Sequence, residues 1–165
     1  MKNILGGALA LGLLCSTAVH AAGYGIVDLE KIVEQSVYIK QQNASMQQQV
    51  KPQTAKIESL TKELEALQQR AQQNTKLSDA EKKSMTQQYQ SKVQELTALQ
   101  QKVQGSVESS IQALNRTMDS RIKQVAEQLR KENNLDVVLN KNSALAYDAK
   151  YDLTDKMIQK VNAIK

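Results

Sequence analysis

The chain has 165 residues, a formal net charge of +5, and neither Trp nor Phe. Its one cysteine, Cys15, and its one histidine, His20, lie in the first 21 residues, which we expect to be removed. The remaining chain would then have no thiol and no imidazole, which excludes disulfides, cysteine or histidine zinc sites, Ser-His-Asp triads and Cys-His pairs. We therefore expect that the protein is not an enzyme and that it binds neither a cofactor nor a metal ion.

The N-terminus has the three parts of a secretory signal peptide. Lys2 supplies the positive charge, residues 4–19 are apolar, and Val19-His20-Ala21 is a small-residue cleavage site. The apolar run is shorter than the roughly 20 residues that span a membrane, and no stop-transfer pattern follows it. We predict a signal peptide over residues 1–21, cleaved after Ala21, and export of the rest.

The exported chain begins with a predicted strand from Tyr24 to Leu29, which is rich in apolar and β-branched residues. A helix is predicted from near Glu30. Within it, Pro52 predicts a bend, which is either a built-in curve or a tolerated kink. Apolar residues recur with the spacing of a coiled-coil seam at Met46, Val50, Ile57, Leu60, Leu64, Leu67 and Ala71.

A second helix is predicted from Ser78 to about residues 132–134. Ser78 and Glu81 have the spacing of a capping box, and the apolar periodicity lapses over residues 72–76 just before them. Two periodic helices with a short connection lie antiparallel, so residues 43–115 are predicted to form a helical hairpin, the arm. The apolar positions of this second helix are Met85, Tyr89, Val93, Leu96, Leu99, Val103, Val107, Ile111, Leu114, Met118, Ile122, Val125 and Leu129.

After the second helix, the pattern predicts a strand over 135–140, a turn over 140–143 and a second strand over 144–147 that pairs with the first. A last helix follows, capped by Asp152 or Thr154. Residues 22–42 and 116–165 would together form a small sheet-containing body. Three short strands and one helix make too little core to be stable alone, so we expect oligomerisation.

The predicted fold class is therefore mainly α, a long antiparallel helical hairpin on a small α/β oligomerisation domain. The order of these elements resembles that of the Skp (OmpH-like) periplasmic chaperone family over the whole mature chain. The residues that carry the resemblance lie at the two ends: Ile26-Val27-Asp28, Leu135-Asp136-Val137-Val138-Leu139, Ala144-Leu145-Ala146-Tyr147 and Asp152-Leu153-Thr154-Asp155.

The resemblance implies a jellyfish-like homotrimer in the periplasm, with arms around a cavity that holds unfolded outer-membrane proteins without ATP. It implies a trimer core made of Ile26, Val27, Leu29, Val137, Val138 and Leu139. The expected function is then that of a holdase chaperone, which prevents unfolded outer-membrane proteins from aggregating and aids their delivery for outer-membrane assembly. The alternative is a structural coiled-coil spacer or tether in the cell envelope.

The apolar stripe of the arm can pack one helix on the other or contact a client, and we expect packing to use most of it. The expected packing positions are Val50, Ile57, Leu60, Leu64, Leu67, Leu96, Leu99 and Val103. Client contact is expected from the adaptable side chains of Met46, Met85 and Tyr89, although each of these is also explained as core or as scattered surface.

The charge of the arm is modest. Residues 43–115 carry nine Lys or Arg and seven Asp or Glu, a net of +2. The resemblance implies strongly basic arm tips, whereas here Asp79 and Glu81 lie among Lys76, Lys82 and Lys83, so we expect electrostatic capture by the arm to be weaker than in the family. The mature chain has a net charge of +4, which is +5 less Lys2; this attracts anionic partners or only maintains solubility. The expected partners are unfolded outer-membrane β-barrel proteins, other copies of the chain and, weakly, anionic lipid. Export and the lack of an aromatic platform argue against nucleic acid.

Overall fold

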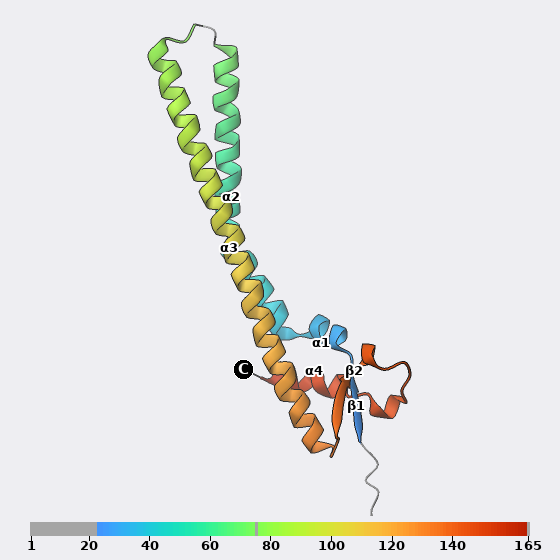
Figure 1. Ribbon diagram of the computed structural model, residues 1–165. Coiled ribbons are helices and arrows are strands. Elements are labelled where there is room, and N and C mark those ends of the chain that lie inside the picture. The colour runs from blue at the N-terminus through green and yellow to red at the C-terminus, as the bar shows by residue number, and fades with distance from the viewer. Residues whose placement is uncertain (1–22, 75, 165) are drawn as a thin grey trace, which may run out of the picture.

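The computed structural model describes residues 23–74 and 76–164, so the predicted signal peptide lies outside the described residues. Figure 1 shows a long hairpin of two helices, α2 (Val37–Gln73) and α3 (Asp79–Glu132), which projects from a small body. Within the described ranges, no helix combines the length and the apolarity needed to cross a membrane. The predicted architecture, a mainly α chain with a helical hairpin on a small α/β body, is confirmed.

The first strand, β1 (Tyr24–Val27), is shorter than the predicted strand over 24–29. It ends because Asp28 is the N-cap of a short helix, α1 (Leu29–Gln35). The Asp28 carboxylate accepts a hydrogen bond from the backbone N–H of Lys31 at 3.1 Å, which satisfies one of the unpaired donors of the first turn. The prediction that Leu29 belongs to the strand is therefore wrong.

The long first helix predicted from near Glu30 is two helices, α1 and α2, separated by Ser36. Ser36 is buried, and its hydroxyl accepts a hydrogen bond from the backbone N–H of Ile39 at 3.2 Å, capping α2. The same hydroxyl donates to the thioether sulfur of Met118 on α3 at 3.6 Å. A polar residue in the body therefore ends one helix and starts the next.

The arm consists of α2 and most of α3. Ser78 and Glu81 form the predicted capping box, with the Ser78 N–H donating to the Glu81 carboxylate at 2.9 Å and the Glu81 N–H donating to the Ser78 hydroxyl at 3.3 Å. Helix α2 continues through Pro52 without interruption. Its 37 residues make it about 55 Å long.

The sheet of the body has two strands, β1 and β2 (Val137–Asn140), which are parallel. Tyr24 lies opposite Val137 and Val27 opposite Asn140. One further parallel bridge joins Ile26 to Asp152. The two ends of the chain therefore meet in one sheet, and the whole arm is the connection between its strands.

Residues 144–147 do not form the predicted second strand, and β2 is not part of a hairpin. After β2 the chain enters a 3-10 turn, η1 (Lys141–Ser143), in which the Ala144 N–H donates to the Lys141 carbonyl at 3.0 Å. The strand that pairs with β2 is β1, from the other end of the chain. Leu145 is left fully exposed, at 109%.

The last helix, α4 (Thr154–Ala163), follows a second 3-10 turn, η2 (Ala149–Tyr151). Its N-cap is Leu153, so neither predicted cap is correct by backbone position. Asp152 still accepts a hydrogen bond from the Thr154 N–H at 2.8 Å. Helix α4 buries its apolar face against the base of α3, with which it forms most of the body core.

The body core is made by helices more than by the sheet. One apolar residue comes from β1, one from α1, three from the base of α3, and four from α4 or the residue before it. These are Val27, Ile32, Met118, Val125, Leu129, Leu153, Met157, Ile158 and Val161. Because the base of α3 carries three of them, the arm and the body are continuous.

Candidate functional site: the helical arm

The seam between α2 and α3 is the main contact inside the arm. Leu60 and Leu64 of α2 are buried, at 0% and 8% exposure. The other expected packing residues are half-buried: Val50, Ile57, Leu67, Leu96, Leu99 and Val103. The seam is therefore closed around its middle and more open elsewhere.

One layer of the seam is polar. The Lys92 ammonium forms an ion pair with the Glu63 carboxylate across the two helices, and the Ser59 hydroxyl donates to the same carboxylate at 2.9 Å. The Lys92 hydrogen bond, followed by that of Ser59, holds the pKa of Glu63 below its usual value. Val93, which the periodicity placed in the stripe, is 37% exposed, so the lysine and not the valine faces the partner helix.

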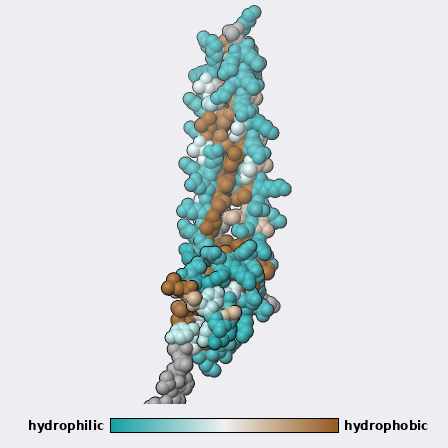
Figure 2. Space-filling view, turned by 90° about the vertical axis from the view of Figure 1, so that its right-hand side faces the viewer, coloured by the Kyte–Doolittle hydropathy of each residue, from teal (hydrophilic) through white to brown (hydrophobic). Residues whose placement is uncertain are grey.

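The apolar surface of the arm is narrow. Figure 2 shows a strip of hydrophobic residues along one face of the arm, flanked on both sides by polar residues. Ile111 contributes to the exposed apolar surface, at 44% exposure, and lies with Val107 on a shallow hollow of α3. Such a surface offers many small apolar contacts.

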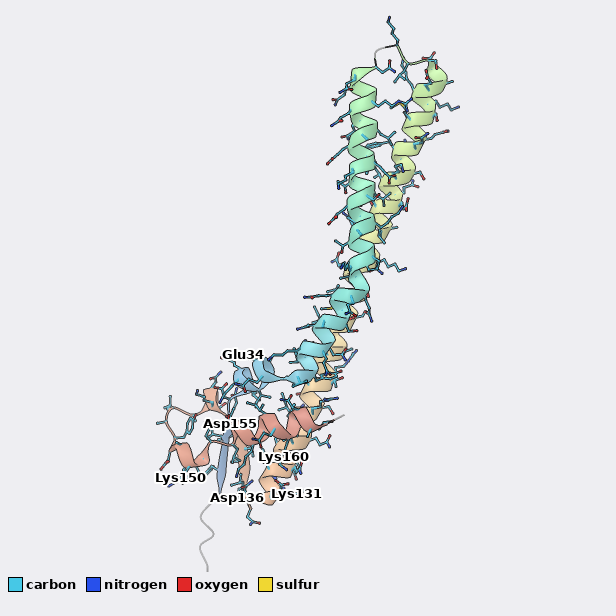
Figure 3. All side chains as sticks on the ribbon, turned by 180° about the vertical axis from the view of Figure 1, so that it is seen from behind. Glu34, Lys131, Asp136, Lys150, Asp155 and Lys160 are labelled. Atoms are coloured by element: carbon cyan, nitrogen blue, oxygen red, sulfur yellow. The ribbon has the colours of Figure 1, made fainter. Side chains whose placement is uncertain are left out.

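The seam opens near the tip, where Figures 1 and 3 both show the two helices diverging. A groove of about 620 Å³ lies between them there. We name it the tip groove. Its apolar lining is Leu67, Ala71, Leu77, Met85 and Tyr89, and its polar lining is Gln68, Asn74, Lys82 and Thr86.

Two of the three predicted client contacts meet in the tip groove. Met85 and Tyr89 lie one turn apart on α3, both half-buried, and both line it. The Tyr89 hydroxyl accepts a hydrogen bond from the Gln68 amide of α2 at 2.9 Å, which bridges the two helices. The structure therefore places these two residues in one site.

The third predicted contact, Met46, lies elsewhere. It lines a smaller pocket of about 160 Å³ at the body end of the arm, together with Tyr38, Ile111 and Leu114. Tyr38 also lies under the Arg121 guanidinium, 4.0 Å from ring centroid to Cζ. Met46, Met85 and Tyr89 were predicted as one set of client contacts, but they lie at two separate places along the arm.

Sequence reasoning missed the role of two apolar residues of the tip groove. Leu77 lies in the connection between the helices, yet it is only 8% exposed. Ala71 was recognised as a seam position, but not as the place where a small side chain leaves the seam unfilled. An apolar residue inside an otherwise polar connection was the available signal for Leu77.

The residues expected in a trimer core have different positions in the single chain. Ile26 and Val27 are buried within the body, each at 4% exposure. Leu29 and Val138 pack against its core, while Val137 and Leu139 are half-buried. The exposed large apolar residues of the body, including those at the start of α2, are Tyr24, Val33, Val37, Leu145 and Tyr151.

The body surface carries a network of ion pairs. Lys31 contacts Asp155 at 2.8 Å and Lys141 contacts Asp28 at 3.1 Å, which ties the chain after β2 and the start of α4 to the start of α1. The N–H of Lys31, and next the ammonium of Lys141, hold the pKa of Asp28 below its usual value. Figure 3 shows Asp155 among the charged side chains labelled on the body.

These carboxylates are engaged in caps and ion pairs. Among the described residues, no group of three or more His, Cys, Asp or Glu side chains is placed to hold a metal ion. Glu132 also belongs to such a pair, with Lys160 at 2.9 Å. The body network therefore joins elements of the fold.

The comparisons with known proteins agree with this architecture. The model of the family "Outer membrane protein (OmpH-like)" matches residues 23–161. Among solved structures, the fold is similar to that of a candidate outer membrane chaperone (OmpH-like) from Caulobacter crescentus, with a TM-score of 0.63 and 16% sequence identity, over 99% of this chain and 90% of that chain. At this identity the likeness shows the fold alone. No curated protein matches the chain.

Proposed function

This chain belongs to the OmpH-like family of outer membrane proteins, and from that premise we propose that it is a periplasmic holdase chaperone. It would bind unfolded outer-membrane β-barrel proteins, prevent their aggregation and aid their delivery for outer-membrane assembly. The action is binding alone, with no ATP and no catalytic step. The signal peptide expected over residues 1–21 accounts for export to the periplasm.

The observation that carries this proposal is the arm with its narrow apolar strip between polar flanks (Figure 2). A holdase must contact apolar segments of a client without trapping them. Small apolar patches give weak single contacts, and several arms around one client give avidity by raising the effective concentration. An arm without Phe or Trp suits such weak, repeated contact.

Avidity requires more than one arm, and we propose a homotrimer assembled through the bodies. The exposed apolar side chains of Tyr24, Leu145 and Tyr151 on the body support self-association, because large apolar groups on a surface favour contact with a partner. The proposed trimer core includes the edge formed by Val137 and Leu139, which the single chain leaves half-buried. Ile26, Val27, Leu29 and Val138 would support this edge from within the body.

The proposed client contacts are Met46, Met85 and Tyr89. Met85 and Tyr89 would act together at the tip, and Met46 would act separately near the body. Methionine and tyrosine side chains adapt to varied partners, which a chaperone of many clients needs. Weak contact with anionic lipid headgroups would follow from the net positive charge.

The rival function is a structural spacer or tether in the envelope, which would use the same long arm. The test is to dilute a urea-denatured outer-membrane barrel protein into buffer that contains the purified mature protein. A holdase lowers the light scattering of the aggregating client and elutes with it as a complex of three chains per client. Unchanged scattering and no co-elution would rule out the holdase and leave the spacer.

A variant tests the trimer separately. Val137→Asp places a charge on β2, so the mass measured by light scattering on a sizing column is expected to fall from three chains to one. Val93→Asp on the exposed flank of α3 is the matched control and should keep the trimer. If Val137→Asp also keeps three chains, β2 does not belong to the shared core.

A further inference from the structure

We propose that the tip groove binds one apolar side chain of an unfolded client at a point where the neighbouring client residues are acidic. This inference rests on the proposed holdase function and deepens it, because it assigns a specific site and a preferred client sequence. It concerns the groove between the two helices of a single arm. It therefore needs neither a particular assembly nor a cavity between arms.

The floor of the groove is apolar and unfilled. Below it, Leu60 and Leu64 close the seam, whereas at the tip the next seam position after Leu67 is Ala71, a small residue that lines the groove and is exposed. Met85 faces this gap from α3, and Leu67 borders it from α2. The result is an opening of about 620 Å³, well within the size range of small-ligand pockets.

The groove is also bounded by contacts that keep it open at a fixed place. The Gln68 amide and the Tyr89 hydroxyl are joined at 2.9 Å. The bonded amide N–H and phenol oxygen are partners of each other, so neither of these two atoms needs a partner from an apolar side chain of the client. At the other end Leu77, just before α3, is buried and lines the groove.

The charge around the groove favours acidic client residues on either side of the bound apolar side chain. Residues 67–89 carry four Lys or Arg and two Asp or Glu, a net of +2, whereas the rest of the arm, 43–66 and 90–115, carries five of each and is neutral. The whole excess positive charge of the arm therefore lies at the tip. Such a field attracts carboxylates over about 8 to 10 Å at ordinary ionic strength.

The two acidic residues at the tip are already engaged. The Glu81 carboxylate accepts hydrogen bonds from the N–H and the hydroxyl of Ser78, and these bonds lower the pKa of Glu81. Asp79 lies 3.7 Å from Lys82. In the described part of the chain, no carboxylate lies within salt-bridge distance of Lys76 or Lys83, and Arg70 acts on Glu81 only at longer range, where it helps to lower the pKa of that carboxyl. An acidic client segment would give these cations their partners.

The test uses three labelled, unstructured peptides and the full mature protein. The first has a central Leu with Asp on each side, the second replaces Leu by Ser, and the third replaces each Asp by Lys. Binding is measured by fluorescence anisotropy. We expect the first peptide to bind at least about tenfold more tightly than either of the others, since burying a leucine and pairing its neighbours each contribute on that scale.

The variants locate the binding to the groove. Ala71→Leu places a larger side chain in the lining of the groove and should weaken binding of the first peptide about tenfold. Ala66→Leu makes the same change at a likewise exposed position of α2 outside the groove and should leave binding within about twofold. A second variant, Lys76→Glu with Lys83→Glu, leaves the lining intact and should reverse the preference toward the Lys-flanked peptide. Circular dichroism establishes that each variant keeps its helix content.

Three results would overturn the inference: equal binding of the Leu and Ser peptides, equal loss with Ala71→Leu and Ala66→Leu, or no response to charge reversal. If vesicles of anionic lipid bind in a manner that Ala71→Leu abolishes while the peptides do not bind, the groove is a lipid site and the inference is wrong. The holdase proposal is judged apart from this. If the Ala71→Leu variant suppresses client aggregation as well as the wild type does, the holdase proposal stands, even if the peptide results contradict the inference about the tip groove.

Discussion

Gln68 of α2 and Tyr89 of α3 are joined by a hydrogen bond of 2.9 Å between the side-chain amide and the phenol oxygen. This bond crosses the arm at the level where the buried part of the seam ends and the tip groove begins. It therefore links the stability of the arm to the shape of its proposed binding site.

Tyr89→Phe should remove this bond without changing the ring. We expect the free energy of unfolding to fall by about 0.5–1.5 kcal/mol, the usual net value of one hydrogen bond. Urea unfolding followed by circular dichroism measures it. In the double variant with Gln68→Met, the second change should add little, because the bond is already lost. Fully additive losses would mean that the two side chains do not interact in solution.

Ser78→Ala should loosen the start of α3. Ser78 caps this helix and shares the capping box with Glu81, so its loss is expected to cost about 1 kcal/mol. Hydrogen exchange should then become faster in the first turns of α3 and remain unchanged at its base near Leu129. Ser84→Ala, an exposed change inside the same helix, is the control. Uniformly faster exchange along the whole helix would contradict a local capping effect.

Gln53→Leu should stabilise the arm. Within the described chain, the side-chain oxygen of Gln53 is buried without a hydrogen-bond partner, which costs about 1–3 kcal/mol. A leucine at this half-buried position of α2 removes that cost and adds apolar contact. The midpoint of thermal unfolding should rise, whereas Gln48→Leu at an exposed position should leave it nearly unchanged. A lower midpoint for Gln53→Leu would indicate that the oxygen has a partner in solution.

Leu129→Ala should destabilise the body strongly. Leu129 has no exposed surface and contacts the core formed with α4, so its truncation is expected to cost about 2–5 kcal/mol. Val93→Ala on the same helix, at a partly exposed position, should change the free energy of unfolding by less than about 0.5 kcal/mol. Similar values for the two variants would show that the base of α3 is not packed as described.

Acid should weaken the base of α3 through Glu127. Its hydrogen bond from Arg130, together with Lys131, lowers the pKa of Glu127 from 4.5 to about 2. A carboxyl whose pKa is lowered by folding stabilises the fold above its unfolded pKa and loses that contribution as the pH falls through the folded value. Melting temperatures of Glu127→Gln and wild type should therefore differ at pH 7 and converge between about pH 4.5 and 2. A difference that stays constant to pH 2 would contradict the ion pair, and Glu58→Gln is the control.

The helical hairpin could be predicted from the sequence alone. Apolar residues at helical spacing define α2 and α3, and Ser78 with Glu81 marks the start of the second helix. These signals are local, because helix periodicity and capping involve residues three or four positions apart. The break at Ser36 was not predicted, although its cap on the Ile39 N–H is local; burial of this serine against Met118 is visible only in the folded chain.

Which strands pair, and which side chains meet between the two arm helices, depends on the tertiary structure. The sequence could identify β1 and β2 as strands, but a short strand has no local signal for its partner, and the nearest candidate, residues 144–147, was the wrong one. In the arm, periodicity could not choose between Lys92 and Val93, because the 3.5-residue seam and the 3.6-residue helix drift apart over several turns. The tip groove is lined by Ala71 of α2 and Met85 of α3, and only the folded hairpin brings these two residues to one site.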